Sequence, residues 1–269
     1  MSTSLDGVLI KKANKTETFT DAQVEDLMKC MDPVNGYMHF ARKFSFIQHP
    51  VKGKLLFDPF EYQTRLLKSY HDHRFNVNML PRQTGKTTTA AIYLAWYAMF
   101  FADQTILIAA HKYTGAQEIM QRIRYVYESC PDHIRAGVTN YNKGSMEFEN
   151  GSRIVSATTT GNTGRGMSIS LLYCDEFAFV NPNIASNGFH GFTCSWDEHP
   201  DRDEEWKRNE IGRIGEEKFR REYGCEFLVF DETLINSIKL ASMESTTPIL
   251  NMGQTRWFGK PTPDENYAV

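Results

Sequence analysis

The chain has 269 residues, 41% of them hydrophobic, and a formal net charge of −3. It is long enough to bury one large core, and its near-neutral charge excludes a strong overall attraction to nucleic acid, so a nucleic-acid contact would be a local basic patch. Its apolar runs are too short to cross a membrane, and the polar N-terminus does not resemble a secretory signal. Five scattered cysteines without a paired spacing argue against a disulfide framework or a zinc site and favour a reducing compartment.

The N-terminal region, residues 1–55, is predicted to be loosely specified over residues 1–40. One amphipathic helix is expected at Asp21–Met31, and Asp32 followed by Pro33 ends it. A second helix is predicted at residues 57–70, because its apolar residues form one stripe.

From residue 56 to residue 230, predicted strands alternate with predicted helices. Apolar runs predict strands at residues 76–80 and Thr105–Ala110, and helical spacing predicts helices at residues 87–101 and 114–127. This alternation is typical of an α/β fold with a mostly parallel sheet flanked by helices.

Three further segments complete the chain. Alternating residues around Asn150-Gly151 predict a β-hairpin with a two-residue turn. A helix is expected at residues 217–223. The last segment, residues 231–269, has proline, threonine and glycine throughout and is predicted to be a linker.

The most informative motif is Pro-Arg-Gln-Thr-Gly-Lys-Thr-Thr at residues 81–88, between a predicted strand and a predicted helix. A helix N-terminus offers unpaired backbone N–H groups and the positive end of a dipole, so this loop is expected to bind a polyphosphate. Lys86 would reach the β- and γ-phosphates, and the Thr87 hydroxyl would bind Mg²⁺. Leu80 stands where such loops usually have a first glycine. The other loop residues expected around the phosphates are Gln83, Thr84, Gly85 and Thr88.

A second half of a nucleotide site is predicted at residues 169–177, a buried strand that ends in two carboxylates. Such strand ends face the crevice where α/β sheets bind ligands. Asp175 would hold Mg²⁺, usually through water, and Glu176 would orient or deprotonate an attacking water, which predicts a hydrolase. The alternative is a strand followed by two solvated turn acids.

The loop before this strand, residues 156–166, is rich in hydroxyl groups and glycine and carries one arginine. It is expected to fold over phosphates and present Arg165 to them, or else to be a flexible connector. Two other stretches could suggest metal ligands. The acid-rich run from Asp197 to Trp206 is better explained as a solvated face, and His71-Asp72-His73 as a helix C-terminus.

Together these motifs resemble the ATPase domain of the large terminase subunit of tailed bacteriophages, the motor that packages DNA into capsids. The resemblance covers about residues 57–228 and implies a P-loop NTPase fold of the additional-strand, catalytic-glutamate type, in a domain at residues 56–230. Its motifs are Phe60-Glu61-Tyr62-Gln63, Arg82-Gln83-Thr84-Gly85-Lys86-Thr87, Thr163-Gly164-Arg165-Gly166, Cys174-Asp175-Glu176-Phe177 and residues 219–228.

The resemblance implies an ATP-hydrolysing enzyme with ATP and Mg²⁺ as cofactors. Arg82 would approach the γ-phosphate, Gln63 would hydrogen-bond the adenine edge, and Tyr62 would pack nearby. The implied partners are double-stranded DNA, the portal protein, the small terminase subunit and further copies of the motor in a ring on the portal. The implied location is the cytoplasm of the infected host, with transient residence on the procapsid portal, and no membrane partner.

Two departures from the family limit these expectations. The chain stops before the family's nuclease domain, so DNA cutting is not expected. Near residues 181–189 the family has a further core strand and a coupling motif, and the strand lies between the phosphate-loop strand and the acidic strand. Without it, either the sheet closes up or another segment, such as residues 189–196, fills the space. We expect nucleotide binding to survive better than hydrolysis, and hydrolysis better than translocation.

Two alternatives therefore stay open. One is a catalytically impaired remnant that binds nucleotide without turnover. The other is a helicase-type ATPase, which the order of motifs disfavours, since Ser156-Ala157-Thr158 precedes the acidic strand instead of following it.

Overall fold

The computed structural model describes residues 3–5, 8–49, 51–110, 112–158, 164, 166–175, 189–225, 250–252 and 255–257. The chain divides into two compact units, Met1–Glu226 and Phe227–Val269. The described part of the second unit is an antiparallel pair, β12 (Leu250–Met252) and β13 (Thr255–Trp257). None of the helices in the described residues has the length and apolarity needed to span a membrane.

The main sheet of the first unit has five strands in the order β10-β6-β9-β8-β7. β10, β6 and β9 are parallel, and β8 and β7 continue the sheet antiparallel, so the α/β class predicted from the sequence is confirmed with a mixed sheet. Their bounds are β6 (Thr105–Ala110), β7 (Val138–Tyr141), β8 (Ser145–Phe148), β9 (Arg153–Thr158) and β10 (Leu171–Cys174). β6 is an unbroken apolar run because both of its faces are buried.

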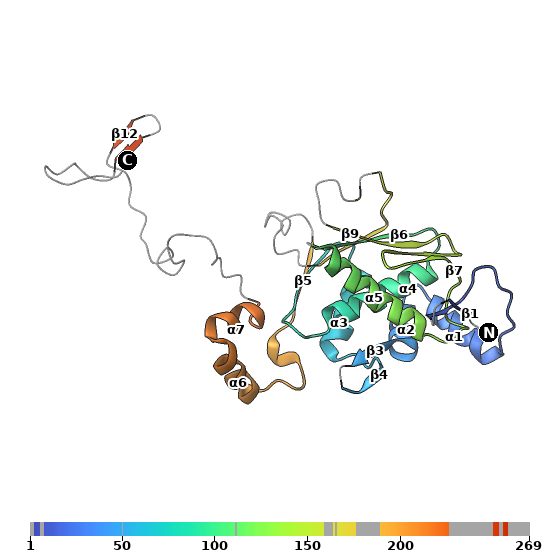
Figure 1. Cartoon of the computed structure of the whole chain (residues 1–269). Helices are drawn as coiled ribbons and strands as arrows, with labels where there is room; N and C mark the ends of the chain where they lie inside the picture. Colours follow the sequence, from blue (N-terminus) through green and yellow to red (C-terminus); the bar gives the residue numbers. More distant parts are fainter. Residues whose placement is uncertain are drawn as a thin grey trace. The chain divides into compact units, whose positions relative to one another are not determined.

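Two long helices, α4 (Lys86–Phe100) and α5 (Tyr113–Ser129), lie along one face of this sheet (Figure 1). α5 is amphipathic and buries one stripe, whereas α4 is apolar on all sides and lies in the core. The Trp96 side chain of α4 is fully buried, and its indole N–H donates to the Cys30 carbonyl at 2.8 Å.

The hairpin between β8 and β9 confirms the predicted pair of strands, but its turn is longer than predicted. Phe148 N donates to the Ser152 carbonyl at 2.8 Å, and Gly151 has φ 81°, so three residues form the turn. Asn150, the middle residue of this turn, binds the end of α4 with its side-chain amide. It donates to the carbonyls at the end of α4, those of Ala98, Met99 and Phe101 at 3.0–3.2 Å.

The N-terminal region packs into the same unit and contains more structure than the sequence analysis predicted. Helix α1 (Asp21–Met31) has the predicted bounds and begins with a capping box between Thr20 and Gln23. The additional elements are β1 (Thr3–Leu5), β2 (Val8–Ile10), α2 (Gly36–Phe44) and the antiparallel pair β3 (Phe46–His49) and β4 (Gly53–Leu56).

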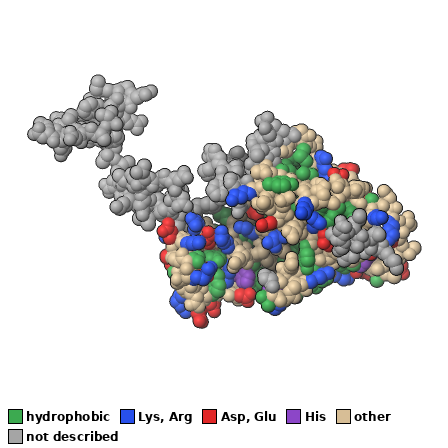
Figure 2. Space-filling view, in the orientation of Figure 1, with side chains coloured by type: hydrophobic (Ala, Val, Ile, Leu, Met, Phe, Trp, Pro, Cys, Tyr) green, Lys and Arg blue, Asp and Glu red, His purple; other side chains and the backbone are tan. Residues whose placement is uncertain are grey.

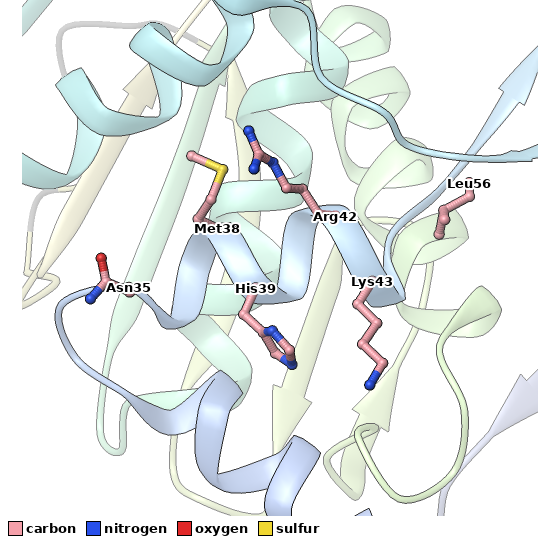
Figure 3. A pocket seen from close by; sticks show the side chains of 6 residues that line it. All are labelled: Asn35, Met38, His39, Arg42, Lys43 and Leu56. Atoms are coloured by element: carbon pink, nitrogen blue, oxygen red, sulfur yellow. The ribbon is translucent and has the colours of Figure 1, made fainter.

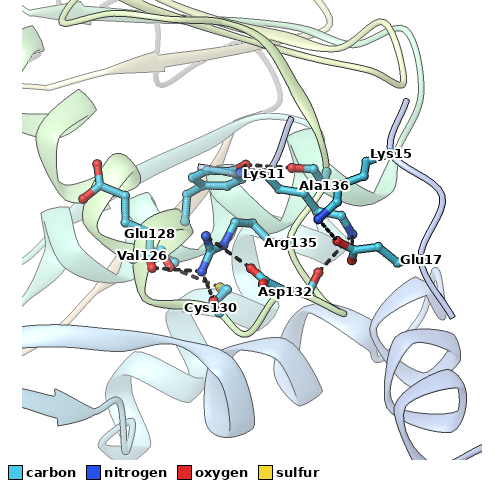
Figure 4. Close-up of polar contacts among 10 residues, drawn as sticks. Lys11, Lys15, Glu17, Val126, Glu128, Cys130, Asp132, Arg135 and Ala136 are labelled. Carbon is cyan, nitrogen blue, oxygen red and sulfur yellow. Dashed lines mark hydrogen bonds and ion pairs between the residues drawn. The ribbon is translucent and has the colours of Figure 1, made fainter. Parts of the chain in front are cut away.

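Polar contacts fasten this region to the end of α5 (Figure 4). The Lys11 ammonium donates to the Asp132 carbonyl at 3.0 Å and pairs with Glu17 at 3.4 Å. The buried Arg135 guanidinium donates to the Cys130 carbonyl at 2.5 Å and the Glu128 carbonyl at 3.2 Å. These bonds satisfy carbonyls at a helix C-terminus that have no partner within the helix.

A separate two-stranded parallel sheet contains β5 (Asn76–Met79) and β11 (His190–Thr193). Neither strand pairs with β10. The expectation that the sheet closes up is therefore wrong, and no segment within the described residues bridges β5 and β10. The segment at residues 189–196 does supply a strand, but that strand pairs with β5 alone.

The remaining helices surround this small sheet. α3 (Glu61–Asp72) begins four residues later than predicted because Pro59 precedes it, and it ends at the predicted histidine pair. After β11 come a 3₁₀ turn (Trp196–Glu198), α6 (Glu204–Ile214) and α7 (Glu216–Glu222).

Candidate nucleotide site

The loop from β5 to α4 has the local geometry of an anion-binding helix start. Gln83 and Gly85 both have left-handed backbone angles, φ 59° and 74°. A Cβ at Gly85 would lie 2.7 Å from the Gln63 amide nitrogen, so only glycine fits there. No side chain caps the first turn of α4, which leaves its backbone N–H groups available to a ligand.

The Thr84 carbonyl anchors this loop to α3. It accepts from the Tyr62 hydroxyl at 2.9 Å and from the Gln63 amide at 3.0 Å, and both side chains are buried. The Thr84 hydroxyl in turn donates to the Pro81 carbonyl at 2.8 Å. The loop is therefore held in its curved shape by the helix that precedes β5.

The Gln63 amide is already used twice within the chain. Its oxygen accepts from Phe60 N at 3.0 Å, and its nitrogen donates to Thr84. One amide hydrogen remains for another acceptor. Beside it, the rings of Phe60, Tyr62 and His199 form an aromatic cluster with centroids 5.1–6.3 Å apart. Burial lowers the pKa of His199 and raises that of Tyr62, so both rings are neutral near pH 7.

Lys86, Thr87 and Thr88 occupy the first turn of α4 and are half-buried. The Thr88 hydroxyl accepts from the Arg122 guanidinium at 3.4 Å. Thr89, one residue further, is buried and donates its hydroxyl to the Gly85 carbonyl at 3.1 Å. The three predicted ligands therefore lie at the open end of the helix, and the residue after them fixes the turn.

The Arg82 side chain forms an ion pair with Glu222 of α7. Arg82 N also donates to the Glu222 carbonyl at 3.0 Å, and the Arg82 carbonyl accepts from the Arg202 guanidinium at 2.7 Å. Arg202 is only 8% exposed, and its guanidinium lies against the rings of Trp206 and Tyr223, 4.7 and 5.2 Å from their centroids. Hydrogen bonds and an ion pair thus hold the start of the loop against the pair α6–α7.

Neither partner of Arg82 is predicted from the sequence. The acid-rich run at Asp197–Trp206, expected to be a solvated face, contains the buried Arg202, and no role is predicted for Glu222. The signal available in the sequence was the set of aromatic residues at Trp206, Phe219 and Tyr223, whose rings pack together in the structure.

The acidic half of the predicted site is described only in part. Asp175 follows β10, is half-buried, and donates its backbone N–H to the Ala109 carbonyl at 3.0 Å. Glu176, Thr163 and Arg165 lie outside the described residues. Gly164 and Gly166, which flank Arg165, have left-handed φ angles of 79° and 77°. The structure thus brings α3, the loop and α7 together, whereas Asp175 belongs to a different sheet from β5.

A separate surface hollow of about 440 Å³ lies on α2 and β4 (Figure 3). Asn35, Met38, His39, Arg42, Lys43 and Leu56 line it. None of these residues belongs to the phosphate loop, and the Lys43 ammonium is paired with Asp26 at 2.5 Å. We do not assign this hollow to the nucleotide.

Comparisons with known proteins give one family and several structures. Residues 77–204 match a family model described as terminase large subunit, T4likevirus-type, N-terminal. The large terminase ATPase domain of Thermus phage P74-26 is similar to this chain, with 17% identity and a TM-score of 0.48 over 64% of this chain and 95% of that one. The large terminase of bacteriophage HK97 has 16% identity and a TM-score of 0.45, over 68% of this chain and 41% of that one.

The large terminase of the thermophilic bacteriophage D6E, solved in complex with ADP, has 15% identity and a TM-score of 0.37, over 61% of this chain and 50% of that one. The residues that match the family model, 77–204, run from β5 through the phosphate loop and β10 to the start of α6.

Proposed function

Residues 77–204 match the model of the terminase large-subunit family, T4likevirus-type, and from this premise we propose that the chain is the Mg²⁺-dependent, ATP-hydrolysing motor domain of a phage DNA-packaging machine. The observation that carries the proposal is the uncapped start of α4, with left-handed Gly85 before it and the Thr84 carbonyl bonded to Tyr62 and Gln63. The backbone N–H groups at this helix start have no side-chain cap, which suits the binding of a polyphosphate.

The residues present fit both cofactors. The phosphates would lie against the N-terminus of α4, with Lys86 beside them, and the hydroxyl of Thr87 and the carboxylate of Asp175 are the hard oxygen ligands that Mg²⁺ prefers. Bound Mg²⁺ would supply charge neutralisation at the phosphates. Glu176 would hold or accept a proton from the attacking water, and Arg165 would add positive charge from the loop before β10.

Base recognition would use the free hydrogen of the Gln63 amide. The aromatic cluster of Phe60, Tyr62 and His199 lies next to it, and its two accessible rings, those of Phe60 and His199, offer faces for an adenine to pack on. Arg82 would approach the γ-phosphate, and for that its ion pair with Glu222 has to open.

The wider role follows the family: translocation of double-stranded DNA into the capsid, in the host cytoplasm, by a ring of copies on the portal with the small terminase subunit. Basic and acidic side chains are interspersed on the face drawn in Figure 2. On that face, a DNA contact would therefore be a small local patch rather than a large basic surface.

A second candidate function is nucleotide binding without efficient turnover. The separation of β5 and β10 into different sheets favours it, since strand pairing does not fix Asp175 relative to Lys86. An error of about 1 Å in such a position costs roughly 10²-fold in rate.

Steady-state ATP hydrolysis with Mg²⁺, measured beside ATP binding, separates the two functions. The variants are Lys86→Ala and Glu176→Gln, with Lys52→Ala in an exposed turn as the control. Turnover that both site variants abolish and the control keeps supports the motor ATPase. The second function is supported if Lys86→Ala alone weakens ATP binding and the unsubstituted chain hydrolyses ATP no faster than the two site variants. Binding unaffected by Lys86→Ala contradicts both.

A further inference from the structure

One edge of β5 is open. The carbonyls of Phe75 and Met79 accept from His190 N at 2.8 Å and Cys194 N at 3.0 Å, so the backbone groups of odd-numbered residues face β11. Because backbone groups alternate in direction along a strand, those of Asn76 and Asn78 face the other edge. No strand of the described residues pairs with that edge.

One edge of β10 is open in the same way. Asp175 N donates to the Ala109 carbonyl, so the backbone groups of odd-numbered residues face β6. Those of Leu172 and Cys174 face away from the sheet, of which β10 is the end strand in the described structure. The Leu172 side chain is 55% exposed, which is unusual for the middle of an apolar strand.

Helix α3 contacts the surroundings of both strands through two neighbouring residues. Its Ser69 hydroxyl donates to the Asn76 side-chain oxygen at 2.7 Å. Tyr70, the next residue, packs against two hydrophobic clusters. One is the main core, against which Tyr173 of β10 also packs, and the other is the small cluster that contains Leu80 and Phe192. Tyr70 and Tyr173 nevertheless keep a small exposed fraction, and the buried Asn78 side-chain oxygen has no hydrogen-bond partner in the described structure.

The chain between the two strands is too short to add a parallel strand there. β10 ends at Cys174 and β11 begins at His190, which leaves 15 residues. A parallel strand between them would need two crossover connections, each of about a dozen residues. One crossover uses nearly all of the available length.

We propose that the open edges of β5 and β10 form a strand-acceptor site, which binds one extended segment of a second polypeptide. Main-chain hydrogen bonds from such a strand pair the open backbone groups of both edges. The residues beneath the site, Tyr70 and Tyr173, determine the chemistry of the bound segment. Its side chains at alternate positions are apolar and lie on these two rings, and the side chains between them are polar and face outward. The bound strand joins the two sheets into one.

Amide hydrogen exchange, followed residue by residue by NMR, tests this on the chain as it is. The expected pattern alternates: Asn76, Asn78, Leu172 and Cys174 exchange fast, whereas Val77 and Tyr173 are protected. The probe for the occupant is a synthetic peptide of alternating valine and threonine with lysines at its ends. Its matched control has proline at the central positions, which removes the donors.

The valine–threonine peptide is expected to slow exchange at the four fast amides by about 10-fold, the effect of one added hydrogen bond each, and the proline peptide is not. Protection of all four amides without peptide overturns the proposal, because the edges are then already paired. Fast exchange that persists at millimolar peptide overturns it as well. Protection on one strand only shows that the edges do not share an occupant. The measurement does not depend on ATP hydrolysis, so it stands if the proposed motor function fails.

Discussion

Arg82 is the residue whose surroundings differ most from those that the sequence suggests. It was expected beside a phosphate, and its side chain is paired with Glu222 while its backbone is bonded to Glu222 and Arg202. The Arg82 side chain is 66% exposed and the Glu222 side chain 16% exposed, so water reaches this ion pair from the Arg82 side. Ion pairs screened by water contribute roughly 0–1 kcal/mol, so this pair can open at small cost.

We therefore expect Glu222→Gln to strengthen ATP binding. Removal of the carboxylate frees the Arg82 guanidinium, while the backbone bond between the two residues stays. The gain is expected to be up to about 5-fold in Kd, measured by calorimetric titration with Mg²⁺ and ATP. Glu217→Gln, an exposed glutamate on the same helix, is the matched control and is expected to leave Kd unchanged. Weaker binding by Glu222→Gln would show instead that the ion pair holds the loop in its binding shape.

For single residues, the sequence predicts a functional site where its members are neighbours in the chain. The loop at residues 81–88 was found because its ligands are neighbours in the chain between a strand and a helix, and the structure places it there. Arg202 is 120 residues from Arg82, and no local pattern links such residues. The roles of Lys86, Asp175 and Glu176 stay predictions.

At the scale of elements, α1 and β6 have the predicted bounds. A capping box marks the start of α1, and an unbroken apolar run marks β6. Helix α2 is not predicted although Tyr37, Phe40 and Phe44 have helical spacing, because Pro33 before it and Gly36 at its first position favour a turn. The separation of β5 from β10 was beyond prediction, since pairing between distant strands has no local signal.

Gly36 determines how closely α1 and α2 approach. A Cβ there would lie 2.3 Å from the Cys30 carbonyl oxygen, which also accepts from buried Trp96. Gly36→Ala is expected to destabilise the fold by about 1–3 kcal/mol, because backbone must move. Gly212→Ala is the matched control in the interior of α6, where a Cβ would meet nothing within 4 Å. It is expected to stabilise by up to about 1 kcal/mol. Urea unfolding measures both, and equal effects would contradict the close approach.

For the whole first unit, three partly buried histidines predict how stability depends on pH. Burial is the main cause that lowers the pKa of His39, His133 and His199 below the ordinary value of 6.5. Below about pH 6.5 the unfolded chain therefore binds more protons than the folded chain, and the free energy of unfolding falls as pH falls. Carboxylates contribute little above about pH 5.5, where they are ionised in both states.

The expected result is a midpoint of urea unfolding that decreases steadily from pH 7.5 to pH 5.5. His133→Phe keeps an aromatic ring beside Phe19 and Phe44 and removes the titrating group, so its decrease is expected to be shallower. A midpoint that is constant over this range, or that rises toward pH 5.5, would show that these rings protonate freely in the folded chain.

The clasp on Arg82 also has a mechanical consequence. The loop is bonded at Thr84 to α3 and at Arg82 to the pair α6–α7, so two bodies hold it at points only two residues apart. Any displacement of α6–α7 relative to α3 changes the distance between Arg82 and Thr84 and so deforms the backbone of Gln83, which lies between them and is already strained in its left-handed conformation. These bonds couple the two bodies in both directions: a movement of α6–α7 displaces the phosphate loop, and a movement of the loop displaces α6–α7.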